Sequence, residues 1–180
     1  MRVVVLGGGP GGLYLALLLR GRHPDWQVRV LERNSADSTF GWGVVFSDET
    51  LGHFEAADAI SYQAITESFR RWSDIDVIVE RERVRSTGHG FCGLGRKQLL
   101  QVLQARCREL GVELCFETSF EGPDEFLDAD LVVAADGINS NCRESRAEIF
   151  RPSLTPGQAR FIWLGTDHVL DTFTFVFRES

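Results

Sequence analysis

A glycine turn near the N-terminus has the spacing of a phosphate-binding loop. Gly7, Gly9 and Gly12 form the pattern GxGxxG, directly after one apolar run and before another. In this pattern the first glycine makes a tight turn, the second lets the backbone approach a pyrophosphate, and the third lets the helix pack closely on the strand. The helix N-terminus adds free N–H groups and a partial positive charge. The pattern predicts a dinucleotide site; the alternative is a turn that only joins core elements.

A carboxylate stands where the ribose of a dinucleotide would be bound. Glu32 directly follows the run QVRVL and lies twenty residues after Gly12. A carboxylate at this position accepts hydrogen bonds from a ribose diol and repels a 2′-phosphate. The alternative is an ordinary surface acid, and the neighbouring Arg33 either packs on the adenine ring or faces water. Glu32 suits FAD and NAD equally, so these residues do not separate the two cofactors.

Two later segments place further candidates near the same edge of the expected sheet. Asp136 and Gly137 begin the segment DGINS after a buried run, and ligands of open α/β folds bind at the carboxyl ends of such strands. Gly137 allows a close backbone approach, whereas Asp136 is alternatively a turn-forming residue. Arg96 stands at the N-terminus of the clearest helix in the chain. Arg143, after DGINS, is equally well explained as a surface ion pair.

The elements that position these residues alternate between strands and helices, which predicts an α/β, Rossmann-like fold. Continuous β-branched runs are typical of buried parallel strands, and apolar residues at a spacing of about 3.6 indicate helices. A loop is expected over Asn34–Gly43, and Gly111 should end the long helix. The expected strands are Arg2–Leu6, Gln27–Leu31, Asp74–Glu80, Arg81–Ser86, Val112–Phe116 and Asp130–Ala135. The expected helices are Leu13–Arg20, one within Ser47–Asp58 and Arg96–Leu110.

The composition excludes several classes of protein. Hydrophobic residues make up 43% and charged residues 25%, which is the mix of a folded soluble chain. The net charge of −7 argues against non-specific nucleic-acid binding. The cysteines show neither CxxC spacing nor a histidine at a zinc-like offset, so free thiols and no metal site are expected. The apolar runs are shorter than the roughly 20 residues of a membrane span, so we expect a cytoplasmic chain without a membrane partner.

The glycine turn, the helix-opening arginine and the DGINS segment occur in the order typical of one family. In this combination the chain resembles the flavin-dependent aromatic hydroxylases, which are single-component FAD monooxygenases. The segments FGWGVVFSD at 40–48 and GHGFCG at 88–93 are most similar to the salicylyl-CoA 5-hydroxylases and anthraniloyl-CoA monooxygenases. The resemblance covers essentially the whole chain. One small departure is Gly11, which stands where the family commonly has alanine.

The resemblance implies a role for each candidate residue. The glycine turn would hold the FAD pyrophosphate, and Glu32 the adenosine ribose. Arg96 would contact the phosphate or ribityl region, with Gln98 as a weaker candidate. The DG pair would serve both FAD and the transient NAD(P)H. The expected cofactor-binding set is Gly7, Gly9, Gly12, Glu32, Arg33, Arg96, Gln98, Asp136 and Gly137.

The reaction implied by the resemblance is ring hydroxylation with NAD(P)H and O₂. The substrate would be an aryl-CoA thioester or a related aromatic acid derivative. The sequence identifies no catalytic residue, because His89 and Trp42 are explained at least as well by structural roles. The alternatives are a non-catalytic FAD- or nucleotide-binding module and an NAD-dependent dehydrogenase. In the dehydrogenase, Arg96 and DGINS would have no role.

The resemblance also implies a division into domains. We expect a FAD-binding domain over residues 1–150, in which about 60–90 is a strand-rich excursion, and the start of an antiparallel, β-rich substrate domain over 151–180. Strands are expected at Arg160–Leu164 and Thr172–Phe177. Family members are at least twice as long, and their Gly-Asp flavin motif has no counterpart here. The chain is therefore expected to be the N-terminal part of a hydroxylase, as a fragment, a truncated gene product or one half of an assembly. We expect it to be inactive alone, and its exposed last strand favours self-association.

Overall fold

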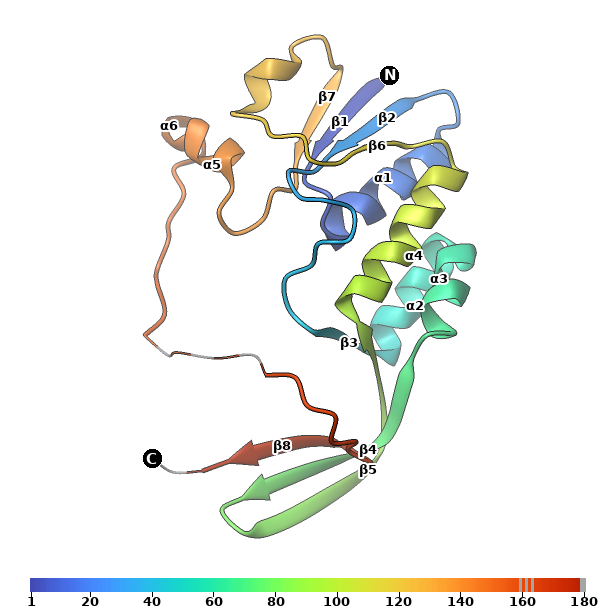
Figure 1. The fold of residues 1–180 in the computed structure, drawn as a ribbon, viewed down its shortest axis with the longest axis vertical. Helices are drawn as coiled ribbons and strands as arrows, with labels where there is room; N and C mark the ends of the chain where they lie inside the picture. Colours follow the sequence, from blue (N-terminus) through green and yellow to red (C-terminus); the bar gives the residue numbers. More distant parts are fainter. Residues whose placement is uncertain (159, 161, 163, 179–180) are drawn as a thin grey trace. The chain divides into compact units, whose positions relative to one another are not determined.

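The protein, described here from a computed structural model, divides into two compact units. The structure describes residues 1–158, 160, 162 and 164–178. Unit 1 comprises Met1–Thr39 and Leu99–Phe161, and unit 2 comprises Phe40–Gln98 and Ile162–Ser180. Each unit is built on its own four-stranded sheet (Figure 1). None of the helices within the described ranges has the length and apolar character of a bilayer span.

Unit 1 contains a fully parallel sheet in the order β6-β2-β1-β7. The central strand β1 pairs with β2 on one side and with β7 on the other, so that Val4 lies between Arg29 and Val132. The sequence predicted these four strands: Arg2–Leu6 and Asp130–Ala135 from continuous apolar runs, Gln27–Leu31 from its alternation, and Val112–Phe116 as the strand after the long helix. Their bounds are Arg2–Leu6 for β1, Gln27–Leu31 for β2, Glu113–Cys115 for β6 and Leu131–Ala134 for β7.

Helices and loops cover both faces of this sheet. On one face α1 and α4 pack together, and the Cys107 thiol donates to the carbonyl oxygen of Leu13 at 3.3 Å. On the other face Val4 and Leu6 of β1 form a cluster with Cys142 of α5. This layered arrangement confirms the predicted Rossmann-like α/β fold. The helices are α1 (Pro10–Arg22), α4 (Arg96–Glu109, whose first turn belongs to unit 2), η1 (Pro123–Phe126), α5 (Asn141–Ser145) and α6 (Ala147–Phe150).

Unit 2 contains a mixed sheet in the order β3-β5-β4-β8. β5 pairs in an antiparallel manner with both β3 and β4, whereas β8 pairs with β4 in parallel. Ser47 is the N-cap of α2 and accepts a hydrogen bond from the N–H of Thr50, as its place in the sequence predicted. The elements are β3 (Gly43–Ser47), α2 (Asp48–Ala57), α3 (Ala59–Thr66), β4 (Arg70–Val79), β5 (Glu82–Gly95) and β8 (Phe173–Phe177).

Several elements differ from the expectations. α1 begins at Pro10, because proline at the first helical position is compatible with helical φ. β5 continues to Gly95, where the glycine-rich segment was not expected to be a strand, and β3 and α3 were not predicted.

The C-terminal segment also differs. β8 pairs in parallel, whereas an antiparallel arrangement was expected. Of the expected strand Arg160–Leu164, residues 161 and 163 lie outside the described residues, and residues 160, 162 and 164 are not in a strand. The units interleave along the chain, and the division into a FAD-binding domain over 1–150 and a substrate domain over 151–180 stays a prediction.

Candidate dinucleotide-binding site

The carboxyl edge of the parallel sheet brings three predicted segments together. The N–H of Gly7 donates to the carbonyl of Leu31 at 2.8 Å, which joins the glycine turn to the end of β2. The N–H of Ala135 donates to the carbonyl of Leu6 at 2.7 Å, which joins the DGINS segment to the end of β1. The glycine turn, Glu32 and Asp136 therefore share one edge of unit 1, as the sequence predicted.

Gly7 and Gly12 are required by the packing of the protein itself. Gly7 has a φ of +115°, a conformation that L side chains rarely adopt. A Cβ on Gly7 would overlap the carbonyl oxygen of Ala135, and a Cβ on Gly12 would overlap that of Gly7. These two glycines let the turn, α1 and β7 approach one another closely.

Gly9 and Gly11 face open space instead. No atom of the described residues lies within 4 Å of a Cβ built on either glycine. Gly9 is the N-cap of α1 and has no side chain with which to cap it, and Pro10 and two glycines follow in the first turn. The N-terminus of α1 therefore presents its N–H groups and the positive end of its dipole without a side chain in the way. The residues present fit the pyrophosphate of a dinucleotide.

Glu32 lies partly buried at the same edge, and its carboxylate is held by the backbone of the turn. Its Oε2 accepts a hydrogen bond from the N–H of Gly8 at 2.8 Å. Its Oε1 accepts from the N–H of Asn34 at 2.8 Å and from the Nδ2 of Asn34 at 2.6 Å. Sequence reasoning missed Gly8 and Asn34; the only available signal was an asparagine two residues after a strand-end carboxylate.

Asp136 and Gly137 play different parts in the DGINS segment. The Asp136 carboxylate accepts hydrogen bonds from the Ser140 hydroxyl at 2.5 Å and from the N–H of Cys142 at 3.2 Å, so it organises its own loop as a turn-forming residue. Gly137 has a φ of +86° and is exposed, and no described atom lies within 4 Å of a Cβ there. Gly137 thus leaves room for a ligand, whereas Asp136 positions the loop.

Arg33, Arg96 and Gln98 complete the set of residues that the sequence predicted to bind the cofactor. Arg33 is exposed. Arg96 and Gln98 belong to unit 2, where the N–H of Arg96 donates to the carbonyl of Trp42 at 3.0 Å and Gln98 is exposed. The Arg96 Nε is buried and has no hydrogen-bond partner among the described residues. Such a donor is suited to an anionic ligand, and the contact of Arg96 and Gln98 with a cofactor stays a prediction.

The side chains that could suggest other chemistry have structural surroundings. The His89 Nε2 lies 2.7 Å from the Ser86 hydroxyl, and its ring lies against that of Phe91. Arg143 donates to the carbonyl of Ile138 at 2.7 Å. Within the described ranges, no three His, Cys, Asp or Glu side chains cluster as metal ligands do.

Two thiols of unit 1 are poor nucleophiles. Burial raises the pKa of Cys107 to about 12. Burial and, to a smaller extent, the negative charge of Asp136 raise the pKa of Cys142 to about 11. Because the thiolate is the reactive form, neither cysteine is suited to covalent catalysis near neutral pH.

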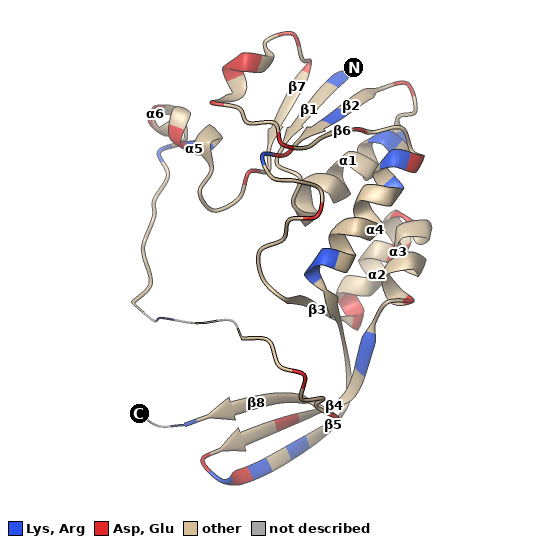
Figure 2. Cartoon of the chain, viewed as in Figure 1, with Lys and Arg blue, Asp and Glu red and all other residues tan. Residues whose placement is uncertain are grey.

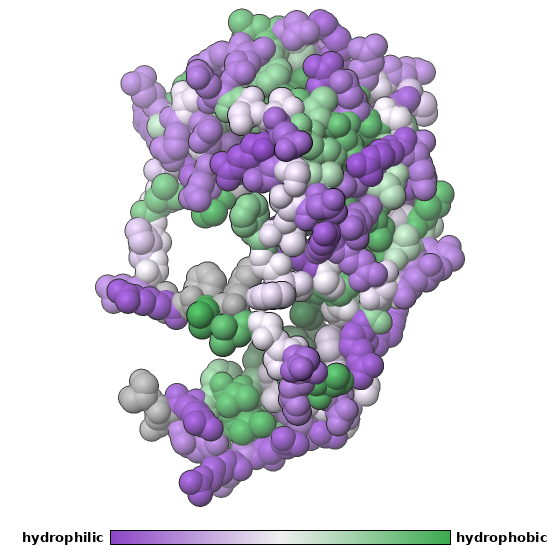
Figure 3. Space-filling model, viewed as in Figure 1, coloured by the Kyte–Doolittle hydropathy of each residue, from purple (hydrophilic) through white to green (hydrophobic). Residues whose placement is uncertain are grey.

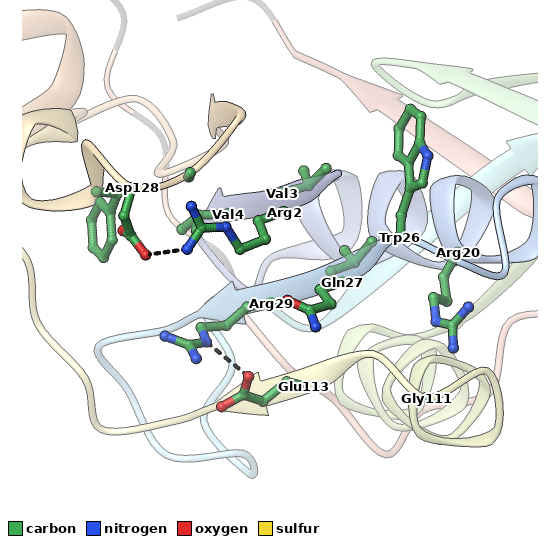
Figure 4. Close-up of a pocket in the computed structure, with 13 residues that line it drawn as sticks. Arg2, Val3, Val4, Arg20, Trp26, Gln27, Arg29, Gly111, Glu113 and Asp128 are labelled. Atoms are coloured by element: carbon green, nitrogen blue, oxygen red, sulfur yellow. Dashed lines mark hydrogen bonds and ion pairs between the residues drawn. The ribbon is translucent and has the colours of Figure 1, made fainter.

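A cavity of about 450 Å³ lies toward the amino ends of β1, β2 and β6 (Figure 4). Two arginines in it already have partners: Arg2 contacts Asp128 at 2.9 Å, and Arg29 contacts Glu113 at 2.8 Å. The glycine turn lies at the other ends of these strands. This cavity therefore offers none of the features on which the dinucleotide prediction depends.

Comparison with known proteins agrees with this geometry. A family model described as "FAD binding domain" matches residues 1–162. The chain is 45% identical to a salicyloyl-CoA 5-hydroxylase of a Streptomyces species, covering 100% of this chain and 35% of that protein. It is 32% identical to protodeoxyviolaceinate monooxygenase of Chromobacterium violaceum, covering 99% of this chain and 48% of that one. A crystal structure of 2-methyl-3-hydroxypyridine-5-carboxylic acid oxygenase superposes with a TM-score of 0.71 at 26% identity, over 80% of this chain and 41% of that one.

Proposed function

Because this chain belongs to the family of FAD-binding domains, we propose that it holds FAD at the carboxyl edge of its parallel sheet and serves an aromatic-ring monooxygenase. The observation that carries the proposal is the open face of the glycine turn. Gly9 and Gly11 have no described atom near their Cβ positions, while Gly7 and Gly12 are tightly packed. The turn is thus closed toward the protein and open toward a ligand.

Each residue at this edge has a distinct task in the proposal. The backbone at Gly9 and the N-terminus of α1 bind the pyrophosphate. Glu32 accepts a hydrogen bond from the adenosine ribose, and Gly137 lets the backbone of the DGINS segment approach the cofactor. By the family resemblance, Arg96 contacts the phosphate or ribityl region of the cofactor, with Gln98 in a lesser role. When bound, FAD supplies the electron transfer from NAD(P)H to O₂ that ring hydroxylation requires.

The class of substrate is proposed from the activity of a matched relative. The first matched relative acts on salicyloyl-CoA, which is an aryl-CoA thioester. We infer that the reaction served here is NAD(P)H-dependent hydroxylation of an aryl-CoA or a related aromatic acid derivative. The chain spans 35% to 50% of the length of three curated relatives that it matches. The first experiment on this chain therefore measures FAD binding rather than turnover.

The test is the visible absorption spectrum of the purified chain after loading with FAD and desalting. Flavin bands that travel with the protein support the proposal. Gly9→Val should abolish them, because its side chain would occupy the space of the pyrophosphate without meeting protein atoms. Gly11→Ala is the matched control and should retain FAD. Retained flavin in Gly9→Val would contradict the site, and binding of NAD in place of FAD would favour the dehydrogenase alternative.

A further inference from the structure

The Glu32 carboxylate has fewer free acceptor positions than its exposure suggests. A carboxylate offers about four lone-pair positions, two on each oxygen. Asn34 fills both positions on Oε1 with its backbone N–H and its Nδ2, and the N–H of Gly8 fills one on Oε2. One acceptor position on Oε2 is left for a ligand. Glu32 can therefore accept one hydroxyl in this arrangement, not two.

The segment that carries Asn34 is itself fixed to the rest of unit 1. The carbonyl of Asn34 accepts a hydrogen bond from the N–H of Glu117 at 3.1 Å, and that of Glu32 accepts from the N–H of Thr118 at 3.0 Å. The carbonyl of Ala36 accepts from the Nε2 of Gln104, which is 5% exposed, at 3.0 Å. These bonds fix the backbone on both sides of Asn34, so its N–H and its Cα are held in place beside the Glu32 carboxylate.

We propose that Asn34 is a positioning residue for the cofactor. Together with the N–H of Gly8, it fixes the Glu32 carboxylate so that Oε2 accepts a single hydroxyl of the adenosine ribose. A carboxylate that is already oriented loses less conformational freedom when the ligand binds, and this raises affinity. This inference rests on the proposed FAD site and adds to it a residue that acts through Glu32.

The test is a double-mutant cycle read by FAD affinity, measured from the quenching of flavin fluorescence. Asn34→Ala removes one hydrogen bond to a carboxylate and keeps the backbone N–H, so FAD should bind about tenfold more weakly. In a Glu32→Ala background the same change should have no further effect, because Asn34 acts only through Glu32. Affinity for ADP, which contains the same ribose, should follow the same pattern. Ser35→Ala, an exposed neighbour, is the matched control and should leave both affinities unchanged.

The outcomes separate the inference from the function on which it rests. If Glu32→Ala weakens FAD binding and Asn34→Ala does not, the positioning role is wrong and the ribose contact stands. If Asn34→Ala weakens binding equally in both backgrounds, its effect does not pass through Glu32 and the inference is wrong. If Glu32→Ala has no effect, or if the native chain binds neither FAD nor ADP, the proposed ribose contact fails together with the inference. Circular dichroism of each variant verifies that the fold is retained.

Discussion

The two sheets of this molecule are stabilised in different ways. In unit 1 the central strand β1 is covered on both faces, and its Val3, Val5 and Leu6 are at most 1% exposed. In unit 2 the side chains alternate between a charged face and an aromatic face. Phe173, Phe175 and Phe177 share one face of β8, where Phe175 and Phe177 remain 43% and 55% exposed (Figure 3).

The charged face of unit 2 contains a buried carboxylate. Acidic and basic residues are interspersed along β4 and β5 (Figure 2). Asp76 is 2% exposed and pairs with Arg85 through two hydrogen bonds of 2.8 and 2.9 Å, and Thr172 donates to it at 2.9 Å. The glycine turn of unit 1 thus requires a close approach of backbone, whereas the buried carboxylate of unit 2 requires specific side-chain partners. A side chain added at Gly12 should therefore destabilise unit 1, and removal of the charge of Asp76 should destabilise unit 2.

The largest expected effect is that of Gly12→Ala. The added Cβ would meet the carbonyl oxygen of Gly7, which is backbone and cannot move aside, so we expect a loss of about 3 kcal/mol in the free energy of unfolding. Gly11→Ala is the matched control in the same turn; it meets no described atom and should be neutral or stabilising by less than about 1 kcal/mol. Urea denaturation measures both, and equal stability of the two variants would contradict the packing role of Gly12.

A second prediction concerns acid and unit 2. Hydrogen bonds from the Arg85 guanidinium, and to a smaller extent from Thr172, lower the pKa of Asp76 from 3.8 to about 2. A lowered carboxyl pKa in the folded state stabilises the fold above the ordinary pKa, and this contribution is lost as the pH falls through about 2. Between about pH 4 and pH 2, the protection factors of the β4 and β8 amides, which are corrected for the intrinsic exchange rate at each pH, should therefore fall more than those of β1 and β2.

Asp76→Asn is the control for that measurement. It keeps the volume of the side chain and removes the charge, so its β4 and β8 amides should exchange faster than those of the native chain at pH 6. Their extra acid sensitivity between about pH 4 and pH 2 should disappear. An unchanged acid sensitivity would assign the effect to a group other than Asp76.

A third prediction compares one buried thiol from each unit. Cys92 in unit 2 is 1% exposed and Cys107 in unit 1 is 0% exposed, and burial raises the pKa of both. Both therefore react with a thiol reagent only after local opening. Because the sheet of unit 2 leaves an apolar face uncovered, we expect Cys92 to react about tenfold faster than Cys107 under native conditions. The reaction rates are measured on single-cysteine variants and divided by the rates of the same variants in denaturant. A faster reaction of Cys107 would contradict the expectation that unit 2 opens more readily than unit 1.

The smallest expected effect is that of Glu80→Gly in the β4–β5 hairpin. Glu80 has a φ of +55°, which costs an L-residue about 1–2 kcal/mol, and its N–H donates to the carbonyl of Phe177 at 3.1 Å. Glycine removes the strain and keeps the N–H, but it loses more conformational entropy on folding than glutamate does. The free energy of unfolding of unit 2 should therefore rise by up to about 1 kcal/mol. Glu80→Ala keeps the strain and should not stabilise. Thermal unfolding followed by circular dichroism compares the variants.

The part of the fold that the sequence predicted best is the first βαβ unit. The run at Arg2–Leu6 is apolar because both faces of this central strand are covered, and Gln27–Leu31 alternates because one of its faces is exposed; both patterns are local. The strand β5 was underestimated, since Gly90 and Gly93 resemble a loop. In the structure Gly93 lies in close contact with the Trp72 ring, and a side chain on Gly90 would collide with the Asp48 carboxylate. The glycines of β5 therefore allow neighbours to approach it, which becomes visible only when those neighbours are known.

The sequence alone determined the glycine turn, the carboxylate at Glu32 and the strands and helix that place them, because these depend on residues close together along the chain. Only the tertiary structure decided that Gly7 and Gly12 serve packing while Gly9 and Gly11 face open space. It also decided that β8 pairs in parallel with β4, and that Asn34 and Gly8 share the carboxylate of Glu32. These contacts join residues on different strands and loops, and their distances are set by how the chain crosses the sheets rather than by any local pattern.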